Sequence, residues 1–148
     1  MNFTQELEKL KHDICEKWLD YCQRNEEWIC TLMNANSLWR NTNEEIDQYL
    51  IEADQEKFES WNTSRPNADF IIGVVSNFNL EAQSLIGFTT TLSTNRDVII
   101  QSLGLNFDPF LEIERRKFSQ SQQATLIPAS SELDDIREQI KQNSGEIT

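Results

Sequence analysis

The stretch SRPNADFIIGVV, residues 64–75, places a proline shortly before the most apolar run of the chain. Proline has a fixed φ and no backbone N–H, so it suits the first turn of a helix. The run from Phe70 to Val75 is apolar on nearly every side of a helix, which is typical of a buried, central helix. The stretch therefore predicts a helix from Pro66 to about residue 77 at the centre of the fold.

Other helices are expected on both sides of this central one, because apolar residues recur there every three or four positions. They are predicted over about residues 3–23, 42–60, 80–92 and 94–103, and a last helix should begin at Pro109 with Asp108 as its cap. Thr42 with Glu45 three residues on has the pattern of a capping box. We predict an all-α fold, a compact bundle of about five to six helices.

The composition changes after Phe118. Residues 119–123 read SQSQQ, a run too poor in apolar side chains to enter a core, so it indicates a flexible linker. The prediction is a helical ligand-binding and dimerisation domain over residues 1–118, followed by a flexible acidic tail over residues 119–148. Four tryptophans and the apolar central helix exceed what one thin helical layer can hide, so a homodimer is expected.

The chain is strongly acidic, with a formal net charge of −12. Such a charge argues against binding to naked nucleic acid or to an anionic membrane by bulk electrostatics. The charge is uneven, because residues 63–118 hold 5 basic and 6 acidic side chains and four of the seven arginines. An anionic ligand should therefore bind in this nearly neutral middle segment.

Signatures of catalysis and of metal binding are missing from the sequence. His12 is the only histidine, and there is no Gly-rich phosphate loop and no GxSxG motif. The three cysteines form no CxxC pair, which predicts reduced thiols in a cytoplasmic protein. No signal peptide and no membrane helix are expected, since no apolar run approaches about 18 residues. The sequence predicts a non-enzyme without metal or cofactor.

Arg65 is the first candidate for a ligand contact. It precedes Pro66 and is expected where the chain enters the central helix. Backbone N–H groups at a helix start have no partner in the helix and favour anions, so Arg65 is a candidate phosphate contact. The alternative is that Arg65 pairs with a surface carboxylate.

Several stretches of the chain resemble a family of small cyanobacterial proteins long labelled as a domain of unknown function. They are Lys17–Tyr21 (KWLDY), Arg65–Pro66, Phe70–Val74 (FIIGV) and Leu103–Pro109 (LGLNFDP). The resemblance covers about residues 3–118, and the family is similar to the CdgR-type cyclic-di-GMP receptors of filamentous cyanobacteria. It implies an all-helical homodimer that binds cyclic-di-GMP at the dimer interface and passes the signal to a protein partner such as a transcription regulator.

The side chains of the middle segment suit this ligand. Cyclic-di-GMP has two phosphates and two guanines, so a two-fold dimer would present one Arg65 to each phosphate. Asp69 could accept from guanine N1–H and N2–H, and an aromatic ring could stack on a base. The predicted ligand-binding residues are Trp61, Ser64, Arg65, Asp69, Phe107, Phe110, Arg115 and Arg116. The alternative function is that of a ligand-free acidic adaptor that docks a basic partner.

Overall fold

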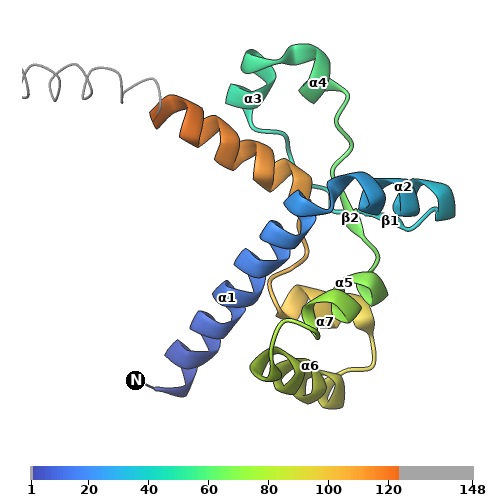
Figure 1. The fold of residues 1–148 in the computed structure, drawn as a ribbon, viewed down its shortest axis with the longest axis vertical. Helices are drawn as coiled ribbons and strands as arrows, with labels where there is room; N and C mark the ends of the chain where they lie inside the picture. Colours follow the sequence, from blue (N-terminus) through green and yellow to red (C-terminus); the bar gives the residue numbers. More distant parts are fainter. Residues whose placement is uncertain (1, 124–148) are drawn as a thin grey trace, which may run out of the picture. The chain divides into compact units, whose positions relative to one another are not determined.

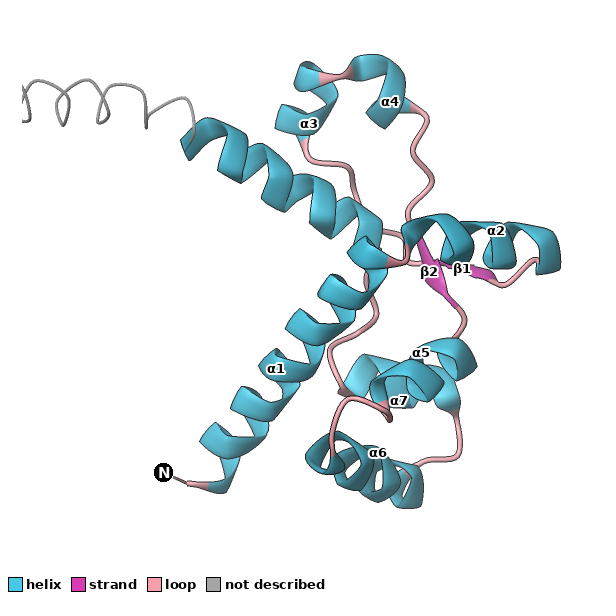
Figure 2. Cartoon of the chain, in the orientation of Figure 1, coloured by secondary structure: helices cyan, strands magenta, loops and turns pink. Residues whose placement is uncertain are grey.

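The computed structural model describes residues 2–123, which are mostly helical (Figures 1 and 2). The labelled elements are α1 (Phe3–Arg24), α2 (Glu26–Asn36), β1 (Trp39–Asn41), α3 (Gln48–Ala53), α4 (Gln55–Glu59), β2 (Ser64–Pro66), α5 (Ala68–Val75), α6 (Leu80–Leu92) and α7 (Arg96–Ser102). A last helix, over residues 109–123, follows α7. The predicted all-α class is confirmed. No helix among the described residues is long and apolar enough to span a membrane.

The chain divides into two compact units, one ending at Ile113 and the other starting at Glu114. The first unit contains α1 to α7 and the start of the last helix. The described part of the second unit, residues 114–123, continues that helix, and Lys117 lies 3.8 Å from Glu114 one turn earlier.

Helix α1 begins at Phe3, as the sequence predicts, and buries the later part of its apolar stripe. Asn2 and Gln5 form a reciprocal capping box, in which the Asn2 side chain accepts from the Gln5 N–H at 2.9 Å. Ile14 and Trp18 lie on the inner face and are almost completely buried. Because the two residues are one helical turn apart, they face the same core.

Helix α5 is part of that core, but it starts later than predicted. Ile71 and Val75 are fully buried, which confirms the expected apolar helix. The helix begins at Ala68, and the Asn67 side chain caps it by accepting from the Phe70 N–H at 3.1 Å. The prediction that Pro66 is the first helical residue is therefore wrong, since Pro66 belongs to β2.

The two short strands form an antiparallel pair that the sequence did not predict. Trp39 lies opposite Pro66, Arg40 opposite Arg65, and Asn41 opposite Ser64. Each strand has three residues, too few for a periodic pattern to stand out. The pairing connects residues about 25 positions apart and directs the chain into α5.

The single helix predicted over residues 42–60 is replaced by an irregular segment and two short helices, α3 and α4. Thr42 does not form the predicted capping box, because its hydroxyl donates to the Glu44 carboxylate at 3.1 Å. That carboxylate also accepts from the Asp108 N–H at 2.9 Å, a contact across 64 residues. A long-range contact therefore holds this segment in a non-helical conformation.

The last helix begins as predicted and extends further than predicted. The Asp108 carboxylate accepts from the N–H groups of Phe110 and Leu111 at 3.0 and 3.1 Å, as an N-cap does. Residues 119–123 are helical, so the linker predicted there is wrong, and helix propagation from the preceding turns explains the difference. The rest of the predicted tail, residues 124–148, lies outside the described residues.

Candidate functional site

A pocket of about 600 Å³ lies between α1 and α5. Its lining comes from the last turns of α1 and from α5 with the turn that follows: Lys17, Asp20, Tyr21, Arg24, Gly73, Val74, Asn77 and Phe78. We call it the α1–α5 pocket. Its volume falls within the range of about 300–1,000 Å³ typical of small-molecule sites.

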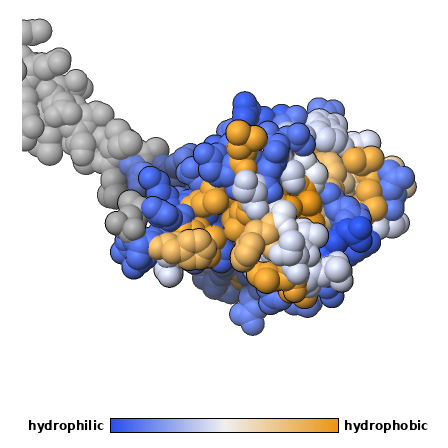
Figure 3. Space-filling model, turned by 90° about the horizontal axis from the view of Figure 1, so that it is seen from below, coloured by the Kyte–Doolittle hydropathy of each residue, from blue (hydrophilic) through white to orange (hydrophobic). Residues whose placement is uncertain are grey.

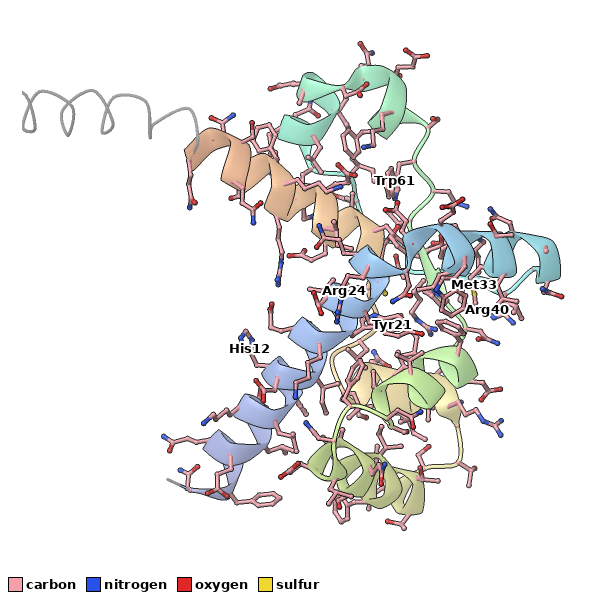
Figure 4. All side chains as sticks on the ribbon, viewed as in Figure 1. His12, Tyr21, Arg24, Met33, Arg40 and Trp61 are labelled. Atoms are coloured by element: carbon pink, nitrogen blue, oxygen red, sulfur yellow. The ribbon has the colours of Figure 1, made fainter. Side chains whose placement is uncertain are left out.

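The α1 side of this pocket is one face of a regular helix. Three of the lining residues, Asp20, Tyr21 and Arg24, follow Lys17 by three, four and seven positions. All four side chains therefore project from the same side of α1. Figure 4 shows Tyr21 and Arg24 near the end of this helix. The buried Trp18 beside them anchors the helix, so the polar face is carried on a rigid element.

Both signs of charge are present and accessible in the α1–α5 pocket. Arg24 forms an ion pair with Asp20 one turn earlier, and the two side chains are 72 % and 59 % exposed. Exposed ion pairs of this kind contribute at most about 1 kcal/mol to stability, so a ligand can replace either partner with little loss of free energy. Lys17 is exposed and forms no ion pair with any described residue.

Aromatic rings form the wall behind these charges. Tyr21 stacks on Trp18 with the ring centroids 6.3 Å apart and contacts Phe78 with a centroid distance of 6.5 Å. Trp28 and Phe70 complete the group, with ring centroids 5.9 Å apart. Tyr21 and Phe78 are only half-buried, so the pocket offers aromatic surface to a planar group.

Asp108 organises a second set of polar contacts, deep in the first unit. Its Oδ2 accepts from the Trp61 indole N–H at 2.9 Å and from the Ser64 N–H at 3.0 Å. Its Oδ1 accepts from the two N–H groups that it caps, so four donors surround a carboxylate that is 2 % exposed. This contact ties the β2 segment to the start of the last helix.

Arg65 has a similar interior role. The side chain is 5 % exposed, and the guanidinium donates to Asn106 Oδ1 at 2.9 Å, to the Pro66 carbonyl at 3.0 Å and to Asp97 Oδ1 at 3.0 Å. It lies in β2 and not at a helix start, which corrects the position predicted for it. The alternative drawn from the sequence, a pair with a surface carboxylate, is present, since the Asp97 side chain is 70 % exposed.

Asp69 lines a small polar pocket of about 330 Å³ together with Arg40, Arg96 and Asp97. Its carboxylate forms an ion pair with Arg96 at 2.5 Å, and the two side chains are about two-thirds exposed. Asp97 connects this pocket to Arg65, so the structure brings Asp69 close to the Arg65 contacts without a direct bond.

The other residues predicted from the sequence do not form one site. Trp61, labelled in Figure 4, stacks on Phe58. Trp61 and Ser64 are both half-exposed. Phe110 is buried edge-on against Trp39, and Phe107 packs partly buried against the core. Arg115 and Arg116 belong to the second unit, and both have interaction partners. A ligand role for these residues stays a prediction.

The residues that line the α1–α5 pocket were not among the predicted site residues. The sequence does carry a signal for them, because two ionisable bases, an acid and a tyrosine recur at helical spacing beside the apolar stripe of α1. The opposite wall has no such signal. Gly73 and Asn77 have neighbours on α1 only because α5 packs against it.

The thiols of Cys22 and Cys30 are held in the protonated form. Burial raises the pKa of Cys22, with smaller contributions from Cys30, Asp108 and Glu26. Burial also raises the pKa of the half-buried Cys30. Neither environment favours a reactive thiolate. Among the described residues, no three His, Cys, Asp or Glu side chains are arranged to hold a metal ion.

The free energy of unfolding should fall at alkaline pH because of Cys22. An unfolded thiol loses its proton above about pH 8.5, whereas the folded one keeps it, so unfolding releases a proton in that range. This contribution is fully present below about pH 8.5, and about 2 kcal/mol of it is lost by pH 10. Urea unfolding at pH 7 and pH 10 should show a smaller loss for Cys22→Ala than for the parent. Equal losses would exclude this origin.

The family of the chain follows from one match among known proteins. No curated protein and no solved structure matches this chain. A family model does match, over residues 38–135, a span that includes Arg65, Asp108 and the α5 wall of the pocket. The chain therefore belongs to the family of unknown function DUF5331.

Proposed function

We propose that this protein is a receptor for cyclic-di-GMP and that it binds the dinucleotide through the α1–α5 pocket. One observation carries the proposal: a single pocket holds two cations, a carboxylate and aromatic surface. These groups correspond to the three parts of a guanylate, which are the phosphate, the hydrogen-bonding edge of guanine and the face of the base.

Each group has a distinct role in this proposal. Lys17 and Arg24 bind phosphate oxygens, for which arginine provides a bidentate pair of donors. Asp20 accepts from guanine N1–H and N2–H after its exposed ion pair with Arg24 opens. Tyr21 or Phe78 stacks on a base, a contact that contributes about 1–3 kcal/mol.

The symmetry of the ligand favours a dimeric receptor. Cyclic-di-GMP has a two-fold axis, so two copies of the protein around that axis would each bind one half of the ligand. The pocket suits this arrangement, because Lys17, Asp20, Arg24 and Asn77 are exposed and a second copy could cover them. In this proposal the ligand-bound dimer passes the signal to a protein partner such as a transcription regulator.

In this proposal the principal phosphate contacts are Lys17 and Arg24 of α1, and not Arg65. The three donors of Arg65 described above already have partners inside the protein, and little of the side chain reaches solvent. A phosphate would have to displace those partners and enter the interior. At Arg24 a phosphate would displace only the exposed Asp20 carboxylate and would stay at the surface, because the Arg24 side chain is 72 % exposed.

Calorimetric titration with cyclic-di-GMP tests the proposal. Replacing both Lys17 and Arg24 with alanine should weaken binding by a hundredfold or more, since charge-assisted contacts contribute about 1.5–3 kcal/mol each. Arg96→Ala is the matched control, because Arg96 is an equally exposed arginine paired with an exposed aspartate outside the pocket. It should bind within threefold of the parent.

A second comparison separates recognition of guanine from attraction to phosphate. Asp20→Asn should weaken binding of cyclic-di-GMP by tenfold or more, because the amide has one acceptor oxygen and its NH₂ group would face a guanine N–H donor. The same variant should not weaken any binding of cyclic-di-AMP, because Asp20 makes no contact with phosphate and its neutralisation leaves Arg24 unpaired. A parent protein that does not bind cyclic-di-GMP, or a double variant that binds it as the parent does, would refute the proposal.

A further inference from the structure

A second hollow of the first unit is an apolar groove of about 490 Å³ between α1 and α6. Six of its nine lining residues are apolar, and the full lining is Phe3, Glu6, Leu7, Leu10, Leu80, Glu81, Ser84, Leu85 and Phe88. We call it the α1–α6 groove. Figure 3 looks onto the face of the first unit where α6 and the start of α1 lie, and apolar side chains gather on that face.

The groove is the uncovered beginning of the stripe that forms the core. Further along α1 this stripe continues into Ile14 and Trp18, which are buried. No element within residues 2–123 covers its first turns, and Phe3 is 74 % exposed. Across the groove, Leu80 and Phe88 of α6 are 75 % and 58 % exposed. Neighbouring apolar side chains left open in this way mark an interaction surface.

The charges of the groove decide what fits there. Among the described residues, Glu6 and Glu81 are the only ionisable ones that line it, one on each helix. If a second copy of the chain docked by the same surface, it would bring four carboxylates together without a base among the lining residues. A partner with cations beside its apolar side chains would instead satisfy both the apolar floor and the acidic edges.

We infer that the α1–α6 groove binds an amphipathic helix of a partner protein, with Leu or Phe side chains in the groove and Lys or Arg beside Glu6 and Glu81. A helix suits the site because residues at i, i+3, i+4 and i+7 form a narrow apolar face. The groove lies on the first turns of α1 and the α1–α5 pocket on its last turns. Docking in the groove therefore does not depend on the proposed ligand.

Fluorescence anisotropy with three synthetic peptides tests the inference on the full chain. The first is an 18-residue helix with Leu on one face and Lys elsewhere, and it should bind with a micromolar dissociation constant. The second has the same composition in an order without an apolar face. The third has Glu in place of Lys. The second and third should bind at least tenfold more weakly.

Two matched variants separate the groove from general attraction to an acidic protein. Phe88→Asp should weaken binding of the basic peptide by tenfold or more, whereas Leu92→Asp should bind this peptide within twofold of the parent. Both residues are exposed apolar positions of α6, but only Phe88 lines the groove. Attraction to the net charge of −12 alone would be strengthened by either added carboxylate, which is the opposite of the result expected for Phe88→Asp.

Charge variants test the edges of the groove. Glu6→Gln combined with Glu81→Gln should weaken binding of the basic peptide threefold or more and reduce the salt dependence of that binding. Glu8→Gln should not, because Glu8 does not line the groove. Unchanged binding in Phe88→Asp, or no binding of the basic peptide to the parent at 1 mM, would overturn the inference. So would light scattering that shows Phe88→Asp converting a dimer into a monomer, because a second copy would then occupy the groove.

Two variants distinguish failure of the proposed ligand site from failure of the groove. The Lys17→Ala, Arg24→Ala double variant should no longer bind cyclic-di-GMP but should still bind the basic peptide. Phe88→Asp should lose binding of the peptide and retain binding of cyclic-di-GMP.

Discussion

Replacing Asp108 with alanine should lower the free energy of unfolding by about 3–5 kcal/mol. The carboxylate accepts from four N–H groups and is 2 % exposed, so its removal leaves the Trp61 indole and three backbone donors without their acceptor. It also removes the cap of the last helix. For a chain of this size the melting temperature should fall by about 10 °C or more.

Two variants show whether this loss comes from the buried carboxylate. Asp108→Asn retains an acceptor oxygen but places an NH₂ group among donors, so about half of the loss is expected. Asp69→Ala removes an exposed carboxylate paired with an exposed arginine, and should change stability by less than about 1 kcal/mol. Urea unfolding followed by circular dichroism measures all three. An Asp108→Ala protein as stable as Asp69→Ala would contradict the role assigned to Asp108.

Arg65→Ala should destabilise the protein by about 2–3 kcal/mol. The variant loses three hydrogen bonds and the packing of a side chain that is 5 % exposed. Asn106 is exposed and the Asp97 side chain is 70 % exposed, so water can solvate them afterwards and limit the loss. Arg65→Lys should recover only part, because an ammonium group cannot reproduce the planar fork.

Arg40 provides the control for Arg65, since it is the same residue type directly opposite in the two-stranded sheet. Its side chain is exposed and donates to the carbonyls of Ser37 and Trp39, which water can also reach. Arg40→Ala should therefore change the free energy of unfolding by less than about 1 kcal/mol. Equal effects of the two substitutions would show that burial does not separate them.

Local sequence determined the helices whose signals lie within a few turns. The stripe of α1, the apolar run of α5 and the Asp108–Pro109 start of the last helix were all predicted, because periodicity and capping act between neighbouring residues. The acidic composition and the lack of catalytic motifs likewise belong to the sequence alone. These features place the protein in an acidic all-α class.

Tertiary structure decided the rest, because the deciding contacts join residues far apart in the chain. The β1–β2 pairing, the Glu44–Asp108 contact and the burial of Arg65 depend on partners 23 to 64 residues away, which no local pattern encodes. The same holds for the α1–α5 pocket and the α1–α6 groove, each of which needs two helices to pack side by side. Arg65 was accordingly placed at a helix start by its neighbour Pro66, whereas packing put it in a strand and made it part of the interior.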